Sequence, residues 1–257
     1  MHNKIFLIIE FTIRDLKERY IGTGLGNIWF ILSPLVMIFI YSIIFSDFMK
    51  MKLNIVDNSY AYSIYLIPGL FSWTAFNNTL MRLNTSFFEK ANLIKKISVP
   101  MYIFQISITF AEFTTFFISM LLGVFFLLII HQPITVDLFI IIPIMILQTI
   151  FSFGLGVIIS LFTPFIKDLK EIIPIILQIW FWMTPIVYVR NIIEKKYPYI
   201  LTYNPFYYFA RTYQDLFLYD KLPTFNSIII MIAESILVIL IAIVLYKKMI
   251  GTIKDII

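Results

Sequence analysis

Long apolar segments separated by short polar stretches dominate the chain and predict an all-α integral membrane protein. A spanning helix needs about 20 mainly apolar residues, and six segments approach or exceed that length: 29–48, 62–81, 101–130, 138–162, 172–189 and 225–246. The turn His131-Gln132-Pro133 joins the third segment to the fourth, and Pro174 and Pro185 bracket the fifth. We therefore expect a single membrane domain over residues 1–257 with six transmembrane helices.

The N-terminal segment 1–28 follows a different pattern and predicts an amphipathic interface helix. Apolar residues recur at spacings of three and four and share one face: Ile5, Ile9, Ile13, Leu16 and Tyr20. Glu10, Arg14 and Lys17 lie on another face, where Glu10 and Arg14 form a favourable i,i+4 pair. A helix of this kind lies in the membrane surface rather than crossing it. Three glycines then break the helix before the first span: Gly22, Gly24 and Gly26.

The connection 190–224 is too apolar for a solvated loop, yet Pro198 and Pro205 break it into pieces too short to span a membrane. Re-entrant or interfacial helices fit this composition. The bilayer tolerates such helices only where protein or a water-filled cavity covers their backbone. The segment therefore predicts an outer gate, with simple aromatic anchoring at the outer membrane boundary as the alternative.

Composition supports a membrane location and excludes several classes of protein. The chain is 60% apolar and 14% charged, whereas soluble domains are about half apolar and a quarter charged. This balance excludes a soluble enzyme and a nucleic-acid-binding module despite the net charge of +5. With the N-terminus inside, the inner segments hold 13 Lys and Arg and the outer segments hold 7. The bias predicts that both termini are cytoplasmic.

The residue types needed for catalysis or metal binding are scarce. The sequence has no Cys and two His, His2 and His131, which argues against disulfides, thiolate chemistry and a histidine-rich metal centre. The glycine-rich stretch 22–26 lacks the lysine of a phosphate-binding loop. We expect no catalytic residue, metal site or cofactor site on this chain.

Glu112 and Glu234 lie inside predicted spans, where a carboxylate is costly and has to pair or face the protein interior. One interpretation is a proton relay in a secondary transporter. The other is a hydrogen bond to Ser, Thr or Asn on a neighbouring helix. We find no intramembrane Lys or Arg to answer either residue and no inverted repeat, which favours the hydrogen bond.

Aromatic residues make up 18% of the chain, and some of them cluster. Flat rings stack on the apolar face of sugars while Tyr and Trp donate hydrogen bonds, so a channel lined in this way would hold a glycan loosely. Elsewhere such rings simply face lipid. The candidate channel residues are Trp29, Phe30, Trp180, Trp182, Tyr188, Phe206, Tyr207 and Tyr208.

The inner loop carries a short amphipathic pattern over 86–97 that ends in Lys95 and Lys96, and terminal lysines suit the C-terminal dipole of a helix. It predicts either a basic membrane-surface loop or a docking helix for a cytoplasmic motor. On the N-terminal helix, Arg14, Lys17 and Arg19 lie where anionic lipid headgroups attract positive charge.

Several short motifs occur together along almost the whole chain. They are Arg14-Asp15-Leu16-Lys17-x-Arg19-Tyr20, Leu25-Gly26-x-x-Trp29, Pro34-Leu35, Pro68-Gly69-Leu70-x-x-Trp73, Asn92-Leu93-Ile94-Lys95-Lys96, Pro100, Lys167-Asp168-Leu169, Thr184-Pro185-Ile186-Val187-Tyr188 and Asn204-Pro205. On these motifs the chain resembles the membrane permease of type-2 ABC exporters, in the branch that exports polysaccharides such as O-antigen, capsule and teichoic acid.

The resemblance implies a homodimer that works with two copies of a separate cytoplasmic ATPase, which would hold the ATP and Mg²⁺. Segment 86–97 would be the coupling helix, and Glu10 to Tyr20 would make a second contact with the ATPase. Spans one and five would line the channel, with re-entrant helices in 190–224 as its outer gate. The docking residues would be Glu89, Leu93, Ile94, Lys95 and Lys96.

The cargo implied by the resemblance is a polysaccharide on a polyprenyl-diphosphate carrier that leaves the bacterial cytoplasm through the inner membrane. Arg14, Lys17 and Arg19 would meet the diphosphate, the ATPase or anionic membrane lipids. Three alternatives stay open: a secondary transporter using Glu112 or Glu234, an integral-membrane transferase acting on lipid carriers, and an exporter of the same family that carries a drug or small lipid.

Overall fold

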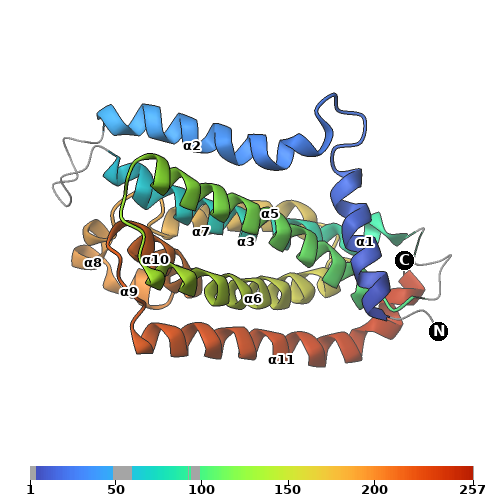
Figure 1. The fold of residues 1–257 in the computed structure, drawn as a ribbon. Coiled ribbons are helices and arrows are strands. Elements are labelled where there is room, and N and C mark those ends of the chain that lie inside the picture. Colours follow the sequence, from blue (N-terminus) through green and yellow to red (C-terminus); the bar gives the residue numbers. More distant parts are fainter. Residues whose placement is uncertain (1–3, 49–59, 92, 94–98, 257) are drawn as a thin grey trace.

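The computed structural model describes residues 4–48, 60–91, 93 and 99–256, and the regular structure in these ranges is helical throughout. Long helices run side by side, with a shorter one lying across one end (Figure 1). Two 3-10 turns, η1 (Gly26–Ile28) and η2 (Val136–Ile140), precede α2 and α6. The helices are α1 (Lys4–Glu18), α2 (Trp29–Phe48), α3 (Ala61–Glu89), α5 (Tyr102–Ile129), α6 (Ile141–Phe162), α7 (Leu169–Met183), α8 (Asn191–Lys196), α9 (Pro198–Thr202), α10 (Pro205–Leu218) and α11 (Phe225–Ile256).

Helix α1 lies across the end of the bundle where both termini are found (Figure 1). Its apolar face is exposed at Ile5, Ile9 and Ile13, and its other side packs against α5. The helix is shorter than the predicted segment 1–28, because the chain turns after Glu18 and reaches a positive φ of 85° at Gly22.

Arg14 of α1 interacts with both acidic residues that lie four positions away. It donates to Glu18 at 2.5 Å. This hydrogen bond raises the pKa of the Arg14 guanidinium, and the negative charge of Glu10 also raises it. Both acidic residues are four positions from Arg14, so spacing alone did not distinguish the two pairs.

Four helical segments in the described ranges are long and apolar enough to cross a membrane: Gly26–Ile44, Tyr102–Ile129, Val136–Phe162 and Phe225–Lys254. They coincide with the predicted spans one, three, four and six. The turn predicted between the third and fourth spans is present, with His131 at a φ of 56°. Helix α11 continues to Ile256, beyond the predicted end at 246.

Helix α3 is the centre of the fold, where it packs against α2, α5, α6, α7 and α10. It starts close to the predicted second span but runs on to Glu89, so the first residues of the predicted coupling helix are the last turn of α3. Ile94, Lys95 and Lys96 lie outside the described residues. Buried polar side chains join α3 to α6: Ser72 donates to Gln148 at 3.1 Å, and Gln148 donates back to the Ser72 carbonyl at 2.8 Å.

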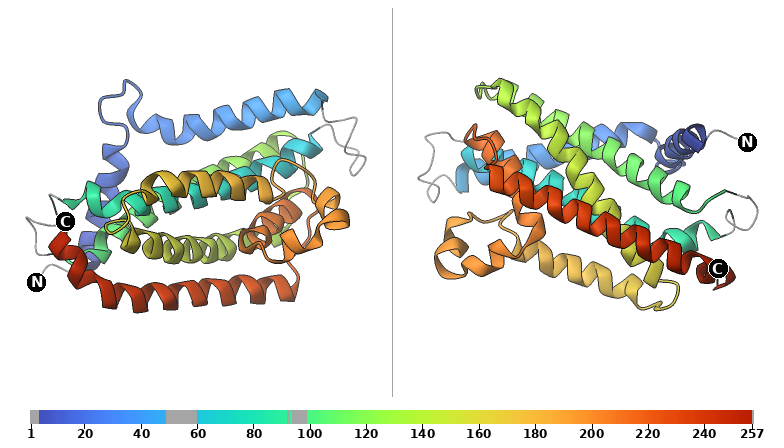
Figure 2. Two further views of the ribbon diagram at one scale, coloured as in Figure 1. Left: turned by 180° about the vertical axis from the view of Figure 1, so that it is seen from behind. Right: turned by 90° about the horizontal axis from the view of Figure 1, so that it is seen from below.

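The predicted fifth span differs from the helix observed there. Helix α7 begins at Leu169, inside the predicted loop, and ends at Met183. Thr184 precedes a proline and adopts an extended conformation with a φ of −103° and a ψ of 129°. The chain then runs without regular structure to α8. Helices α8, α9 and α10 occupy the end of the bundle opposite α1 (Figure 2), so helices do form in the predicted 190–224 segment.

Helices α6 and α11 lie side by side (Figure 2) and approach closely at Gly154. A Cβ atom at this position would lie 2.7 Å from Cγ1 of Val238 and 3.2 Å from the backbone nitrogen of Ile239. Small residues allow this kind of approach between membrane helices. The backbone nitrogen of Ile239 cannot relieve this contact by changing rotamer, as a side chain can.

We expect Gly154→Ala to lower the free energy of unfolding by about 1–3 kcal/mol, the usual effect of overpacking a tight interface. Thermal unfolding of the purified protein in detergent measures the change. Gly251→Ala in the same helix pair is the control, because no atom lies within 4 Å of the added Cβ. Equal unfolding temperatures for the two variants would contradict the close approach.

Candidate functional site

Four charged side chains from different parts of the chain meet near the end of the helix bundle that α1 crosses (Figure 1). Arg82 of α3 donates to Asp15 of α1 at 2.5 Å and to Glu112 of α5 at 2.8 Å. Arg19, just after α1, hydrogen-bonds Glu112, lies 3.7 Å from Asp15, and donates to Thr115 at 3.4 Å. We call Asp15, Arg19, Arg82 and Glu112 the charge network.

The two carboxylates of the charge network are buried, so each depends on its guanidinium partners. Glu112 is 2% exposed and Asp15 is 7% exposed. A carboxylate removed from water is tolerated only when it is paired and hydrogen-bonded, and removing one partner leaves an uncompensated buried charge. Two acids and two guanidinium groups balance one another here. The charge network therefore fastens α1 to α3 and α5.

The apolar pattern of the sequence does not predict this network. The prediction that Arg82 lies in an inner loop and that no basic residue pairs with Glu112 is wrong, because α3 continues past Arg82 to Glu89. One signal was available: Thr74, Asn78 and Arg82 are spaced four apart and continue one polar face of the helix.

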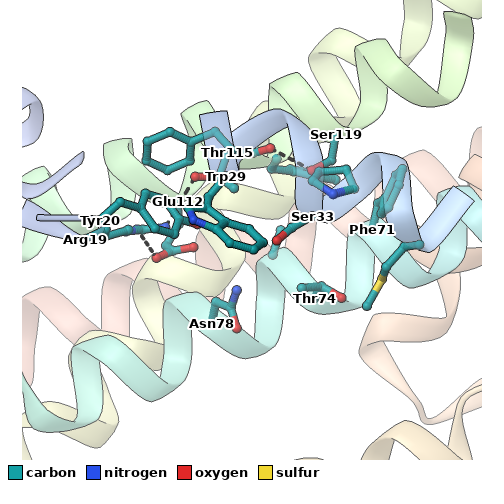
Figure 3. Close-up of a pocket in the computed structure, with 15 residues that line it drawn as sticks. Arg19, Tyr20, Trp29, Ser33, Phe71, Thr74, Asn78, Glu112, Thr115 and Ser119 are labelled. Carbon is teal, nitrogen blue, oxygen red and sulfur yellow. Dashed lines mark hydrogen bonds and ion pairs between the residues drawn. The ribbon is translucent and has the colours of Figure 1, made fainter. Parts of the chain in front are cut away.

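A cavity of about 220 Å³ lies beside the charge network, between α2, α3 and α5. Arg19 and Glu112 form part of its wall, and Trp29 and Phe30 of α2 form another part. Figure 3 shows Ser33, Thr74 and Asn78 pointing toward the same space from α2 and α3. The cavity thus combines aromatic rings with hydroxyl and amide groups.

At the opposite end of the bundle, the irregular segment after α7 has its backbone groups satisfied by side chains. Tyr65 donates to the carbonyl oxygens of Pro185 at 3.0 Å and Tyr188 at 3.2 Å. Tyr62 donates to Val187 at 2.5 Å, and Gln214 donates to Pro185 at 3.0 Å. Non-helical backbone needs such cover in a membrane protein, and α3 and α10 supply it.

Asn204 joins the end of α7 to the start of α10. Its side-chain oxygen accepts from Trp180 Nε1 at 2.7 Å and from the backbone nitrogen of Phe206 at 3.1 Å. Its amide nitrogen donates to Thr184 Oγ1 at 2.8 Å. Asn204 therefore caps α10 and fixes the position at which α7 ends.

An ion pair holds the next part of this segment. Arg190 lies 2.6 Å from Asp215 of α10. Burial lowers the pKa of the Arg190 guanidinium, the Asp215 carboxylate raises it more, and the net pKa lies above its ordinary value. The guanidinium therefore stays charged and holds the segment to α10.

The structure distributes the predicted channel aromatics between the two ends of the bundle. Trp29 and Phe30 line the cavity beside the charge network. The other six lie near α8 to α10 and differ in exposure: Phe206 and Tyr207 are buried, Trp180, Tyr188 and Tyr208 are half-buried, and Trp182 is 58% exposed. The Trp180 ring lies among aromatic rings, with Phe76 at 5.2 Å and Trp73 at 6.2 Å between centroids.

The remaining candidate residues occupy separate places. Arg14 and Lys17 are exposed on α1, and Glu89 is exposed at the end of α3. Leu93 is half-buried. Glu234 is half-buried in α11, and its Oε2 atom has no hydrogen-bond partner among the residues that the structure describes.

Comparison with known proteins assigns the family. The profile of the ABC-2 type transporter membrane family matches residues 7–218, from α1 to the last residue of α10. The chain belongs to this family. The matched region of this ABC-2 type permease includes the charge network, the cavity and the segment held by Asn204.

Named relatives cover nearly the whole ABC-2 permease chain. The O-antigen export system permease protein RfbA of Klebsiella pneumoniae is 29% identical over 244 residues, which are 95% of this chain and 92% of the relative. The RfbA protein of Myxococcus xanthus is 24% identical over 232 residues, which are 90% and 87% of the two chains. The family is that of transporter permease subunits.

We expect Glu112→Gln to destabilise the permease by about 3–5 kcal/mol, because it leaves two guanidinium groups to share Asp15. The matched control is Glu18→Gln, which removes the exposed Arg14–Glu18 pair, whose side chains are 60% and 40% exposed. Exposed pairs contribute about 0–1 kcal/mol. Thermal unfolding in one detergent compares the variants, and similar losses would show that the charge network does not hold the fold together.

We expect Asn204→Ala to cost about 1–3 kcal/mol, because the buried partners of the amide lose their hydrogen bonds. Limited proteolysis should then cut between α7 and α10 faster than in the unchanged protein. Asn27→Ala, at an exposed position before α2, should leave the cleavage rate unchanged. A slow cleavage rate in Asn204→Ala would argue against its role as the connector.

Proposed function

We propose that this chain is the membrane subunit of an ATP-driven exporter that moves a polyprenyl-diphosphate-linked polysaccharide of the O-antigen kind out of the bacterial cytoplasm. One observation carries the proposal. Proteins named as O-antigen export permeases align with 95% of this chain and with 92% of their own length. An alignment that leaves so little of either chain uncovered favours the same role over a shared membrane module. It also favours O-antigen over capsule, teichoic acid, a drug or a small lipid as cargo.

The energy source in this proposal is a separate subunit. The sequence lacks the lysine of a phosphate-binding loop in its glycine-rich stretch. ATP and Mg²⁺ are therefore assigned to two copies of a cytoplasmic ATPase, which bind a homodimer of this chain. The docking surface is the end of the bundle that carries α1 and the exposed Glu89 at the end of α3. Leu93, Ile94, Lys95 and Lys96 complete this surface in the proposal.

The proposed membrane topology has six spans. Helices α3 and α7 are added to the four long apolar segments because they run alongside them (Figure 1). Helices α8 to α10 are assigned to the outer side as re-entrant elements, since they lie at the end opposite α1. The Lys and Arg bias supports cytoplasmic termini in this topology. The proposal assigns the protein to the inner membrane.

The proposed path for the glycan runs between two copies of the chain. Large apolar side chains are exposed on α2 and α7, among them Phe39 at 66% and Trp182 at 58%. Burial of these faces against a second copy gives a reason for their exposure in one chain. Trp182, Tyr188 and Tyr208, near the outer end of α7 and on α10, then offer ring faces to passing sugars.

A proton-coupled secondary transporter is the second candidate. One observation favours it: Oε2 of Glu234 within α11 has no hydrogen-bond partner in the described part of the chain. Glu112 argues against it. That carboxylate is held by two guanidinium groups, which is the arrangement of a fixed structural ion pair rather than of a proton carrier. We therefore favour the ATP-driven exporter.

The experiment is export in cells and in vesicles. Deleting the gene for this chain should remove the polysaccharide from the cell surface and leave lipid-linked glycan in the inner leaflet. In vesicles that hold the chain and its ATPase, glycan movement should require ATP and be unaffected by a protonophore or by Glu234→Gln. Normal surface glycan in the deletion strain, or movement driven by a proton gradient alone, would overturn the proposal.

A further inference from the structure

The mainly apolar wall of the cavity between α2, α3 and α5 carries a group of polar side chains. Thr74 and Asn78 lie four residues apart on one face of α3, and Ser33 of α2 points toward them (Figure 3). Thr115 and Ser119 line the same space from α5. A hydroxyl or amide left without a partner in hydrocarbon is unfavourable by several kcal/mol. A polar occupant of the cavity would supply partners for those of these groups that have none within the protein.

Three of these groups are available to that occupant. Ser33, Thr74 and Asn78 make no side-chain hydrogen bond within the ranges that the structure describes, and all three are exposed or half-buried. Ser119 donates to the carbonyl of its own helix at Thr115 and keeps its acceptor capacity. The cavity thus offers both donors and acceptors.

The charge balance of the wall argues against an anionic occupant, because both guanidinium groups are already paired with carboxylates. Arg19 hydrogen-bonds Glu112 and Thr115 and pairs with Asp15. Arg82 is held by the same two acids. The charge network contains as many carboxylates as guanidinium groups, so the wall offers a phosphate no net positive charge, although Nε of Arg19 has no hydrogen-bond partner among the described residues. This disfavours a role for Arg19 in holding a carrier diphosphate or a lipid headgroup.

Aromatic rings complete the wall. Trp29, Phe30 and Phe71 border the cavity from α2 and α3. An apolar ring face beside a set of donors and acceptors matches a neutral sugar, whose ring has apolar C–H faces and hydroxyls at its edge. The volume of about 220 Å³ is below the roughly 300–1,000 Å³ of sites for drug-sized ligands. It suits a single ring rather than a length of chain.

We propose that this cavity is a subsite for one uncharged sugar unit of the transported glycan, held by the Trp29 ring and by Ser33, Thr74 and Asn78. The inference rests on the proposed function and adds to it the place and the chemistry of a sugar contact within one copy of the chain. Its position beside α1 puts the subsite near the inner end of the bundle (Figures 1 and 3). The glycan therefore meets it early in export.

A protection experiment tests the occupant. The chain has no Cys, so Ser33→Cys places a unique and nearly isosteric thiol in the cavity of the permease–ATPase complex in detergent. A neutral oligosaccharide released from the host polysaccharide should slow maleimide labelling of this thiol at least fivefold. Inorganic pyrophosphate and anionic phospholipid micelles should not slow it. Ile31→Cys is the control, because Ile31 is 47% exposed and lies outside the cavity lining. Its labelling rate should be the same with each of these additions.

Protection by pyrophosphate or phospholipid without protection by the oligosaccharide would overturn the proposal, and so would equal labelling under all conditions.

A second pair of variants tests the export step. Asn78→Leu should reduce glycan export roughly fivefold to tenfold through the lost hydrogen bonds, at unchanged membrane level. Asn77→Leu, the neighbouring residue outside the cavity lining, should export normally.

Failure of the inference can be told from failure of the proposed function. If export requires the chain and ATP while the Asn78 and Asn77 variants behave alike, the exporter stands and the sugar subsite is wrong. If the deletion strain exports normally, the exporter itself is wrong.

Discussion

The structure depends first on the pairing of buried charges between α1, α3 and α5. Asp15 and Glu112 are almost fully buried, and a buried carboxylate is strongly unfavourable without partners such as Arg19 and Arg82. This requirement links a surface helix to the bundle with a specificity that apolar contact does not provide, since lipid is as apolar as the side chains it would replace. Because its carboxylates and guanidinium groups are equal in number, the charge network gives the wall of the adjacent cavity charged groups without a net charge.

The same physical rule organises the end of the bundle opposite α1. Between α7 and α8 the backbone leaves helical geometry, and its carbonyl groups are matched by Tyr62 and Tyr65 of α3 and by Gln214 of α10. Asn204 does the same for the end of α7 and the start of α10. Irregular backbone is thus confined to places where a buried polar side chain has been placed to meet it.

Apolar length predicted the strongest elements and failed where polar side chains are buried. The first, third, fourth and sixth spans follow from runs of apolar residues, and α2 has the predicted bounds of 29–48. Helix α3 was cut short because Arg82 was interpreted as the start of a loop, although its charge is answered by Glu112 far along the chain. Helix α7 was misplaced because apolar content does not mark the extended residue before Pro185.

Helix α3 connects the charge network, the cavity and the segment after α7. Its 29 residues span about 44 Å at 1.5 Å per residue. Arg82, near the end of α3 that contacts α1, belongs to the charge network, and Thr74 and Asn78 face the cavity. Tyr65, near the opposite end, holds the segment after α7. One helix therefore carries residues of all three sites, and Arg82 and Tyr65 cannot leave their partners without a polar group remaining unpaired in the membrane.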